Sequence, residues 1–166
     1  TGVQAELLGV VPTPGVAYLI RKLEADAGVM ISASHNPVAD NGIKFFNKHG
    51  YKLDDELEAE IENCMASGRS DEIQRPVGLE VGRVIQRTTA KEEYIKYLAT
   101  IIGRSFAGVT VVLDCAFGAT YSTAPQVFAA LGAKVITLHA EDDGSRINVR
   151  CGSTAPAALQ EEVVRQ

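Results

Sequence analysis

The chain has 166 residues, of which 46% are hydrophobic and 22% are charged, a composition typical of a globular protein that can bury a core. Its net charge is -5 and it has no basic block, so we expect no nucleic-acid partner, because binding to phosphates needs clustered Lys and Arg. No apolar run approaches the ~20 residues of a membrane span, and no signal-peptide pattern opens the chain. We therefore expect no membrane association and a cytoplasmic location.

The three cysteines, Cys64, Cys115 and Cys151, are far apart and form no CxxC pair. This spacing argues against a structural zinc site and fits a reducing compartment. The chain opens on Thr1 without an initiator Met, and in the middle of a pattern. We therefore expect it to be a piece of a longer protein.

The first part of the chain predicts a strand, a helix and a second strand. Residues 4–10 resemble a short strand, and Thr13 is expected to cap the following helix with Pro14 at its first position. The helix is indicated by apolar residues at helical spacing, namely Val16, Leu19, Ile20 and Leu23. Residues 29–31 form the next predicted strand. This order favours a βαβ unit and an at least partly parallel sheet.

The next stretch combines a polar loop with a further strand and helix. A loop over residues 32–37 (SASHNP) is followed by an Asn41-Gly42 turn and a predicted strand over residues 43–46, which contains Lys44. A helix is predicted over residues 53–66, with apolar residues every four positions, at Leu53, Leu57, Ile61 and Met65. Its first turn is acidic, as the positive end of the helix dipole favours, through Asp54, Asp55 and Glu56.

Periodicity fails between Ser67 and Val81, which we predict to be a loop, and we place a domain boundary near Gly82. The expected domains are residues 1–82 and 83–166. A helix follows, because Thr89 and Glu92 have the spacing of a capping box. Its predicted buried stripe consists of Tyr94, Ile95, Leu98, Ile101 and Ile102.

The last part repeats the plan of the first. Residues 108–114 resemble a strand buried on both faces, and Ser122 or Thr123 can cap a helix that ends near Gly132. A strand over residues 134–138, a loop over 141–154 and a last helix starting within 154–156 complete the pattern. The order of strand, loop, helix and strand thus occurs twice, at about 7–31 and 109–138. We expect an α/β fold with mixed sheets sandwiched by helices, in two domains of similar plan.

Ser34 and His35 lie in the tight loop between two predicted strands, and two interpretations fit them. Ser34 can be a nucleophile presented on a rigid turn, or a capping serine in an ordinary Asn-Pro turn. A serine needs a base or an electrostatic partner, and His35 need not be that base, because adjacent side chains often point apart. The GxSxG elbow is absent, which argues against an ordinary α/β-hydrolase.

Lys44 also has two interpretations: a solvated lysine on the open face of a strand, or a general base that reaches the same loop. The loop after Asp114 lies at the carboxyl end of a strand, where open α/β sheets bind ligands, but it carries no GxGxxG and no Walker lysine. Nucleotide binding is therefore not supported, and Cys115 is expected to pack. The acids Asp142, Asp143 and Asp114 follow no metal-ligand spacing, which favours turn and loop roles.

The string ISASHNP over residues 31–37, followed by DNGIKFF over residues 40–46, resembles the active-site serine loop of the α-D-phosphohexomutases. Within that family it is most similar to the bacterial phosphoglucosamine mutases. Three further stretches fit the family, at residues 11–15 (VPTPG), 114–119 (DCAFGA) and 147–148 (IN) with 151–154 (CGST). The resemblance covers nearly the whole chain. It implies that residues 1–82 are the latter part of the family's domain 1, with the phosphoserine loop, and that residues 83–166 are the first part of its domain 2.

The resemblance implies that Ser34 is the phosphoserine, which donates its phosphoryl group to a hexosamine monophosphate and recovers the other phosphoryl group from the bisphosphate intermediate. Lys44 matches the proton-transfer lysine, and His35 and Asn36 match groups that line the phosphoryl site. The phosphoserine oxygen would be one ligand of a Mg²⁺ ion. The product would serve the synthesis of cell-wall amino sugars.

The departures from the family pattern matter as well. The catalytic arginine motif and the aspartate-rich DGDxDR metal loop are absent from these residues, and Ala155 stands where family members usually carry His. The same chemistry on phosphomannose or phosphoglucose is one alternative, and a non-catalytic α/β module with a vestigial loop is another. Exposed sheet edges in an incomplete domain would also favour a homodimer.

Overall fold

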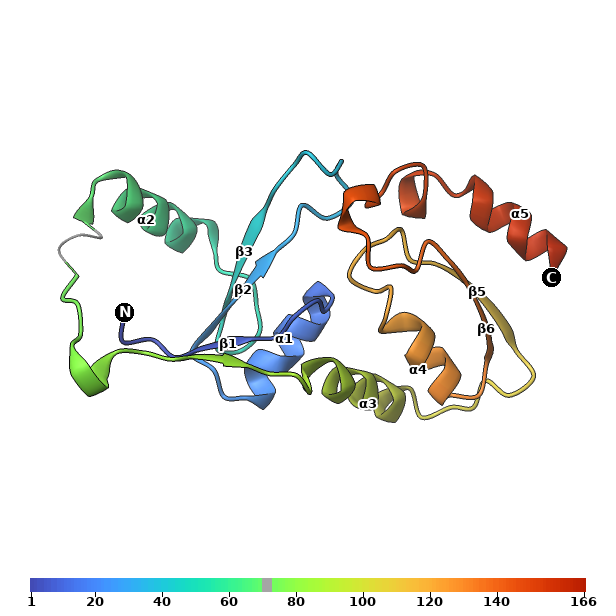
Figure 1. Cartoon of the computed structure of the whole chain (residues 1–166), viewed down its shortest axis with the longest axis horizontal. Helices are drawn as coiled ribbons and strands as arrows, with labels where there is room; N and C mark the ends of the chain where they lie inside the picture. Colours follow the sequence, from blue (N-terminus) through green and yellow to red (C-terminus); the bar gives the residue numbers. More distant parts are fainter. Residues whose placement is uncertain (70–72) are drawn as a thin grey trace.

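The computed structural model describes residues 1–69 and 73–166 and is an elongated α/β arrangement (Figure 1). The described elements of the first half are grouped around the strand pair β2–β3, and those of the second half around β5–β6 (Figure 1). Residues 70–72 of the predicted loop at 67–81 lie outside the described part. The α/β class expected from the sequence is confirmed.

The strand pairing of the first half differs from the prediction. Strand β1 (Ala5–Leu7) pairs in parallel with β4 (Val84–Gln86). The prediction had paired it with the strand that comes after the first helix. That strand, β2 (Ala27–Ile31), pairs antiparallel with β3 (Ile43–Asn47), from Ala27 opposite Asn47 to Ile31 opposite Ile43. The expected βαβ unit over residues 7–31 was therefore wrong, because the loop at 32–42 folds β3 back beside β2.

Helix α1 (Thr13–Lys22) covers one face of the β2–β3 pair and builds the core of the first half. Val16 and Ile20 pack there with Val11 and Phe46. At Gly28 a Cβ atom would lie 2.2 Å from Ile20 Cδ1, so any larger residue here would force the buried Ile20 side chain to shift. The helix begins one residue earlier than predicted: Thr13 is its first residue, and Pro12 precedes it without a side-chain cap.

The other face of the β2–β3 pair is apolar and open, since Ile31 and Ile43 are 73% and 60% exposed. Helix α2 (Asp55–Ala66) stands apart from the sheets at one end of the molecule (Figure 1). Asp54 caps it by accepting a hydrogen bond from the Leu57 N–H at 2.9 Å, so this acid precedes the helix and does not lie within its first turn. The apolar stripe of α2 is not buried: Met65 is 71% exposed.

In the second half the predicted βαβ unit is confirmed. Strand β5 (Thr110–Asp114) pairs in parallel with β6 (Lys134–Leu138), and α4 (Ala124–Ala130) connects them and packs on both. Helix α5 (Ala157–Arg165) packs against β5. Strand β5 is only half-buried, so the expectation of burial on both faces was wrong.

Helix α3 (Ala90–Ile102) joins the two halves by packing on both α1 and α4. The ring of Tyr97 stacks on Tyr18 of α1 with centroids 3.9 Å apart, and Tyr94 is buried beside them. Two details differ from the prediction. Ile101 is 58% exposed, and the Thr89 hydroxyl donates to the Glu93 carboxylate instead of forming a capping box with Glu92.

The division of the chain near Gly82 stays a prediction. Strand β4 follows that position and still pairs with β1, and the Gly82 N–H donates to the Thr1 carbonyl at 2.8 Å. In the part of the chain that the structure describes, we find no helix with the length and apolar character needed to cross a membrane.

Candidate functional site

The serine loop, residues 32–42, is a hairpin connection closed by local hydrogen bonds. The Ser32 N–H donates to the Gly42 carbonyl at 2.8 Å, and the Asn36 N–H donates to the Ala33 carbonyl at 3.2 Å. A Cβ at Gly42 would lie 2.7 Å from the Ser32 carbonyl oxygen, so closing the loop requires glycine. The loop is therefore a defined turn whose tip faces solvent.

Ser34 occupies an exposed, strained position at this tip. Its φ is +63°, in the left-handed region, where a residue other than glycine is held at a cost on the order of 1–3 kcal/mol. The Ser34 N–H donates to the Ser32 hydroxyl at 3.1 Å, which helps to hold the turn. Such strain at an exposed hydroxyl fits a functional side chain better than a capping serine, because no helix follows Ser34.

The structure brings Lys44 to the same loop. Its side chain is half-buried, and its ammonium donates to the Ser32 carbonyl at 3.3 Å. This hydrogen bond links the two ends of the loop, since Lys44 lies just after its last residue and Ser32 is its first. The interpretation of Lys44 as a freely solvated lysine is therefore less favoured than that of a group belonging to the loop.

His35 and Asn36 are both exposed on the loop. The Asn36 side-chain amide donates to the Asp40 carboxylate at 3.1 Å, across the loop. No hydrogen bond joins His35 to Ser34 within residues 1–69 and 73–166. The structure therefore does not assemble a Ser-His pair, and it leaves His35 at the rim of the turn.

A residue from the second half reaches this loop, and sequence reasoning did not single it out. The side-chain amide of Asn148 donates to the carbonyl of Ser34 at 3.3 Å and to that of Asn36 at 3.0 Å. Asn148 is 112 and 114 residues away from these partners along the chain. The sequence places Asn148 in a stretch that fits the family and in a Gly/Asp/Asn-rich loop, where such residues tolerate positive φ, but nothing in it indicated a contact with the serine loop.

Asp114, at the end of β5, organises the loops beside Asn148. Its carboxylate accepts the N–H of Ala116 at 2.9 Å, the N–H of Gly152 at 2.8 Å and Nδ1 of His139 at 3.0 Å. Burial favours a raised pKa for Asp114, but the hydrogen bonds from Gly152, Ala116 and His139 outweigh it and lower the pKa. Asp114 is therefore an ionised structural anchor, consistent with the loop role expected for it.

Asp114, His139 and Cys151 also place potential metal-ligand atoms within 4.8 Å of one another, and no other such group occurs within the described ranges. Burial raises the pKa of the fully buried Cys151 thiol, with help from the nearby Asp114 charge, so the thiol stays protonated. The oxygens of Asp114 are already engaged by three donors. A set of N, O and S donors also suits a transition metal and not Mg²⁺.

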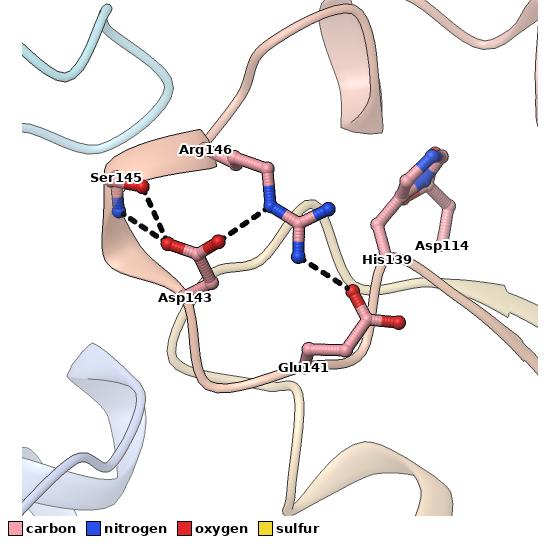
Figure 2. A network of polar contacts seen from close by, with 6 residues as sticks. All are labelled: Asp114, His139, Glu141, Asp143, Ser145 and Arg146. Carbon is pink, nitrogen blue, oxygen red and sulfur yellow. Dashed lines mark hydrogen bonds and ion pairs between the residues drawn. The ribbon is translucent and has the colours of Figure 1, made fainter.

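A separate group of ionic contacts lies in the loop after β6 (Figure 2). The guanidinium of Arg146 donates to Asp143 at 2.6 Å and to Glu141 at 3.2 Å, and it lies 4.0 Å from the centroid of the Phe117 ring. Asp143 also accepts the N–H and hydroxyl of Ser145, which with Arg146 lowers its pKa. Asp143 is thus a turn acid, as predicted.

Comparisons with known proteins support the resemblance of the serine loop to that of the phosphohexomutases. Residues 1–72 match the sequence model described as phosphoglucomutase/phosphomannomutase, alpha/beta/alpha domain I. Phosphoglucosamine mutase of Moorella thermoacetica is 56% identical over 163 residues, which are 98% of this chain and 36% of that protein. Phosphoglucosamine mutase of Clostridioides difficile is 53% identical over 161 residues, which are 95% of this chain and 35% of that protein. The chain therefore spans about a third of the length of these curated relatives.

Solved structures share the fold. A phosphoglucomutase/phosphomannomutase family protein from Burkholderia thailandensis matches with a TM-score of 0.76 and 21% identity, over 98% of this chain and 35% of that one. A putative phosphomannomutase from Thermus thermophilus matches with a TM-score of 0.73 and 21% identity, over 98% of this chain and 37% of that one. Together with relatives more than half identical across nearly all of its residues, this shows that the chain belongs to the phosphoglucomutase/phosphomannomutase family, the α-D-phosphohexomutases.

Proposed function

We propose that this chain supplies the phosphoserine part of a phosphoglucosamine mutase, which interconverts glucosamine 6-phosphate and glucosamine 1-phosphate. The observation that carries the proposal is Ser34, an exposed hydroxyl on a strained turn with the Lys44 ammonium at the base of the same loop. Relatives about half identical to the chain carry that name, which favours glucosamine phosphate over mannose or glucose phosphate as the substrate.

In the proposed reaction Ser34 acts as a phosphoryl carrier. A sugar hydroxyl attacks the phosphorus of phosphoserine 34, the bond between phosphorus and Ser34 Oγ breaks, and a hexosamine bisphosphate forms. Lys44 is the proposed proton-transfer group: its ammonium gives a proton to the leaving Ser34 Oγ and regains one from the sugar hydroxyl. After the bisphosphate turns over, Ser34 Oγ attacks its other phosphoryl group, so the phosphoserine is regenerated and the isomeric monophosphate leaves.

This chemistry needs positioning and charge neutralisation more than an activated nucleophile. A phosphoserine adds about -1.5 to -2 charges at neutral pH, and Lys44 is the cation that the structure places at its loop. His35 and Asn36 are proposed to line the phosphoryl group, since both are exposed beside Ser34. The Asn36 amide, now bonded to Asp40, offers a donor to a phosphate oxygen.

The family also implies Mg²⁺, which would neutralise the charge of the transferring phosphoryl group. Mg²⁺ prefers oxygen ligands, and the phosphate on Ser34 would supply one of them. The Asp114, His139 and Cys151 cluster does not fit this ion, and the described residues offer no other group of three potential ligands. A complete Mg²⁺ site is therefore not formed by the described residues, and we assign it no step.

Phosphorylation by a hexose 1,6-bisphosphate tests the proposal in a full-length phosphohexomutase that carries residues 1–166. We expect intact-mass analysis to show the gain of one phosphoryl group, located at Ser34 by peptide mapping, and no gain in Ser34→Ala. Ser67→Ala is the matched control, because this serine only donates to the Cys64 carbonyl at the end of α2. A phosphoryl group that persists in Ser34→Ala would identify the wrong serine. Comparing the glucosamine, mannose and glucose bisphosphates as donors tests the sugar preference.

A further inference from the structure

We propose that Asn148 is a positioning residue for Ser34, holding the serine loop from the second half of the chain. This inference rests on the proposed function, because it concerns how the phosphoryl carrier is presented. The Asn148 amide donates to the carbonyls of Ser34 and Asn36, at 3.3 and 3.0 Å. Both partners are acceptors, so the two N–H groups of one amide nitrogen serve one carbonyl each. The contact therefore bridges the peptide group between Ser34 and His35 and the one between Asn36 and Pro37.

The backbone of Asn148 is itself fixed by a hydrogen bond to the loop after β5. Its φ is +59°, a conformation that asparagine tolerates better than most side chains, and its N–H donates to the Ala116 carbonyl at 3.1 Å. Asp114 in turn accepts the N–H groups of Ala116 and Gly152, on either side of this contact. The Asn148 loop is thus anchored to the end of β5, so it can position the serine loop instead of moving with it.

A contact from outside the serine loop can stabilise the strained conformation of Ser34. Ser34 is held at positive φ, and within the loop its own backbone is bonded only through the Ser32 hydroxyl. A strained turn persists when its surroundings over-determine it. The bond to the Ser34 carbonyl restricts rotation of the peptide group that follows Ser34, and thereby restricts where its hydroxyl points. Without the bond, the same loop can relax and Ser34 Oγ loses its alignment with the attacked phosphorus.

A matched pair of glycine substitutions separates this role from loop folding in general. Asn148→Gly keeps the left-handed backbone and removes the amide. Arg150→Gly is the control, because Arg150 lies in the same loop at a φ of +54° and makes no hydrogen bond to the serine loop in the described part of the chain. Asn148→Asp is a third variant of nearly equal size, in which a carboxylate would face two carbonyl oxygens and repel them.

The first measurement is the rate of Ser34 phosphorylation by a hexose 1,6-bisphosphate, in a full-length phosphohexomutase that carries residues 1–166. We expect Asn148→Gly to lower the maximal rate roughly 10- to 100-fold relative to Arg150→Gly, since two hydrogen bonds are lost and each is worth up to about tenfold. The half-saturating donor concentration should change by less than about threefold. Asn148→Asp should be at least as slow. Equal maximal rates for the two glycine variants would overturn the inference.

The second measurement does not depend on phosphorylation. Hydrogen exchange of the peptide covering residues 32–42, followed by mass spectrometry, should be faster in Asn148→Gly than in Arg150→Gly, at equal melting temperatures. Unchanged exchange would overturn the inference whatever the rates show. If the unaltered full-length phosphohexomutase takes up no phosphoryl group at Ser34, the proposed function fails, while the exchange comparison still decides whether Asn148 holds the loop.

Discussion

Glu93 is the most informative position at which to test how the two halves are joined. It lies in the first turn of α3, with 17% of its side chain exposed, and receives three cationic or hydroxyl partners. Lys22 of α1 contacts it at 2.7 Å, Arg87 at 3.0 Å and the Thr89 hydroxyl at 2.6 Å. Arg87 also reaches Glu6 of β1 at 3.4 Å, so the group connects α1, β1 and α3.

The size of the effect follows from the pKa of Glu93, which the hydrogen bonds from Lys22 and Thr89 lower from 4.5 to about 2. A depression of that size corresponds to at most about 3 kcal/mol of stability. Lys22 is 40% exposed, and solvent weakens an ion pair of this kind. We therefore expect Glu93→Gln, which keeps the size and removes the charge, to lower the free energy of unfolding by about 1–2 kcal/mol at pH 7.

Urea unfolding between pH 7 and pH 2 tests this assignment. The folded-state pKa is depressed, so the contribution of Glu93 is complete above pH 4.5 and is lost as the pH falls from there towards 2. The difference between the original chain and Glu93→Gln should shrink over that window. Glu92→Gln, at an exposed neighbouring position, should cost less than about 0.5 kcal/mol throughout. A difference that persists at pH 2, or an equal cost for Glu92→Gln, would refute the reasoning.

Three further outcomes are expected. Gly28→Ala should destabilise the chain by about 1–3 kcal/mol in urea unfolding, because its Cβ would lie 2.2 Å from Ile20 Cδ1, whereas a Cβ at the control position Gly144 meets nothing within 4 Å. Asp114→Asn should lower the melting temperature at pH 7 and much less in acid, since the lowered pKa of Asp114 makes its contribution disappear as pH falls; an equal loss at both pH values would contradict this. In a coupled assay, residues 1–166 alone should give no mutase turnover, because the DGDxDR metal loop is not among them, and turnover abolished by Ser34→Ala would show the opposite.

Local sequence patterns predicted individual helices and strands well, but they did not predict which strands pair or which surfaces pack together. Strand β6 has the predicted bounds because Gly132 ends the preceding helix and a polar loop follows. The pairing of β1 with β4 joins residues about 80 positions apart, and nothing in the sequence of either strand predicts which strand it pairs with. The apolar spacing of α2 predicted a helix correctly, yet its apolar side chains stay largely exposed, since periodicity reports local geometry and not what packs against it.

The same limit applied to the site. The serine loop could be recognised from its string of small and polar residues between two apolar runs. The predicted Asn41-Gly42 turn was wrong, because neither residue has a positive φ and the turns of this loop lie at residues 34–35 and 38–39. The adjacency of Ser34 and His35 invited the idea of a pair, but the turn leaves them without a hydrogen bond to each other in the described structure. The contact of Lys44 with the loop was foreseeable, because alternation along β3 places it on the opposite face from Ile43.

The contribution of the second half to the serine loop is what local reasoning could not supply, and it changes how the loop should be understood. Residues 1–72 carry Ser34 and Lys44 and match a domain of the family by themselves. The Ser34 and Asn36 carbonyls are nevertheless bonded to Asn148, whose loop is fixed by Asp114 at the end of β5. The packing of α1 on α3 sets the distance between these two regions. The backbone of Ser34 is therefore held by both halves, and substitutions at their interface should change the orientation of Ser34 without altering its loop.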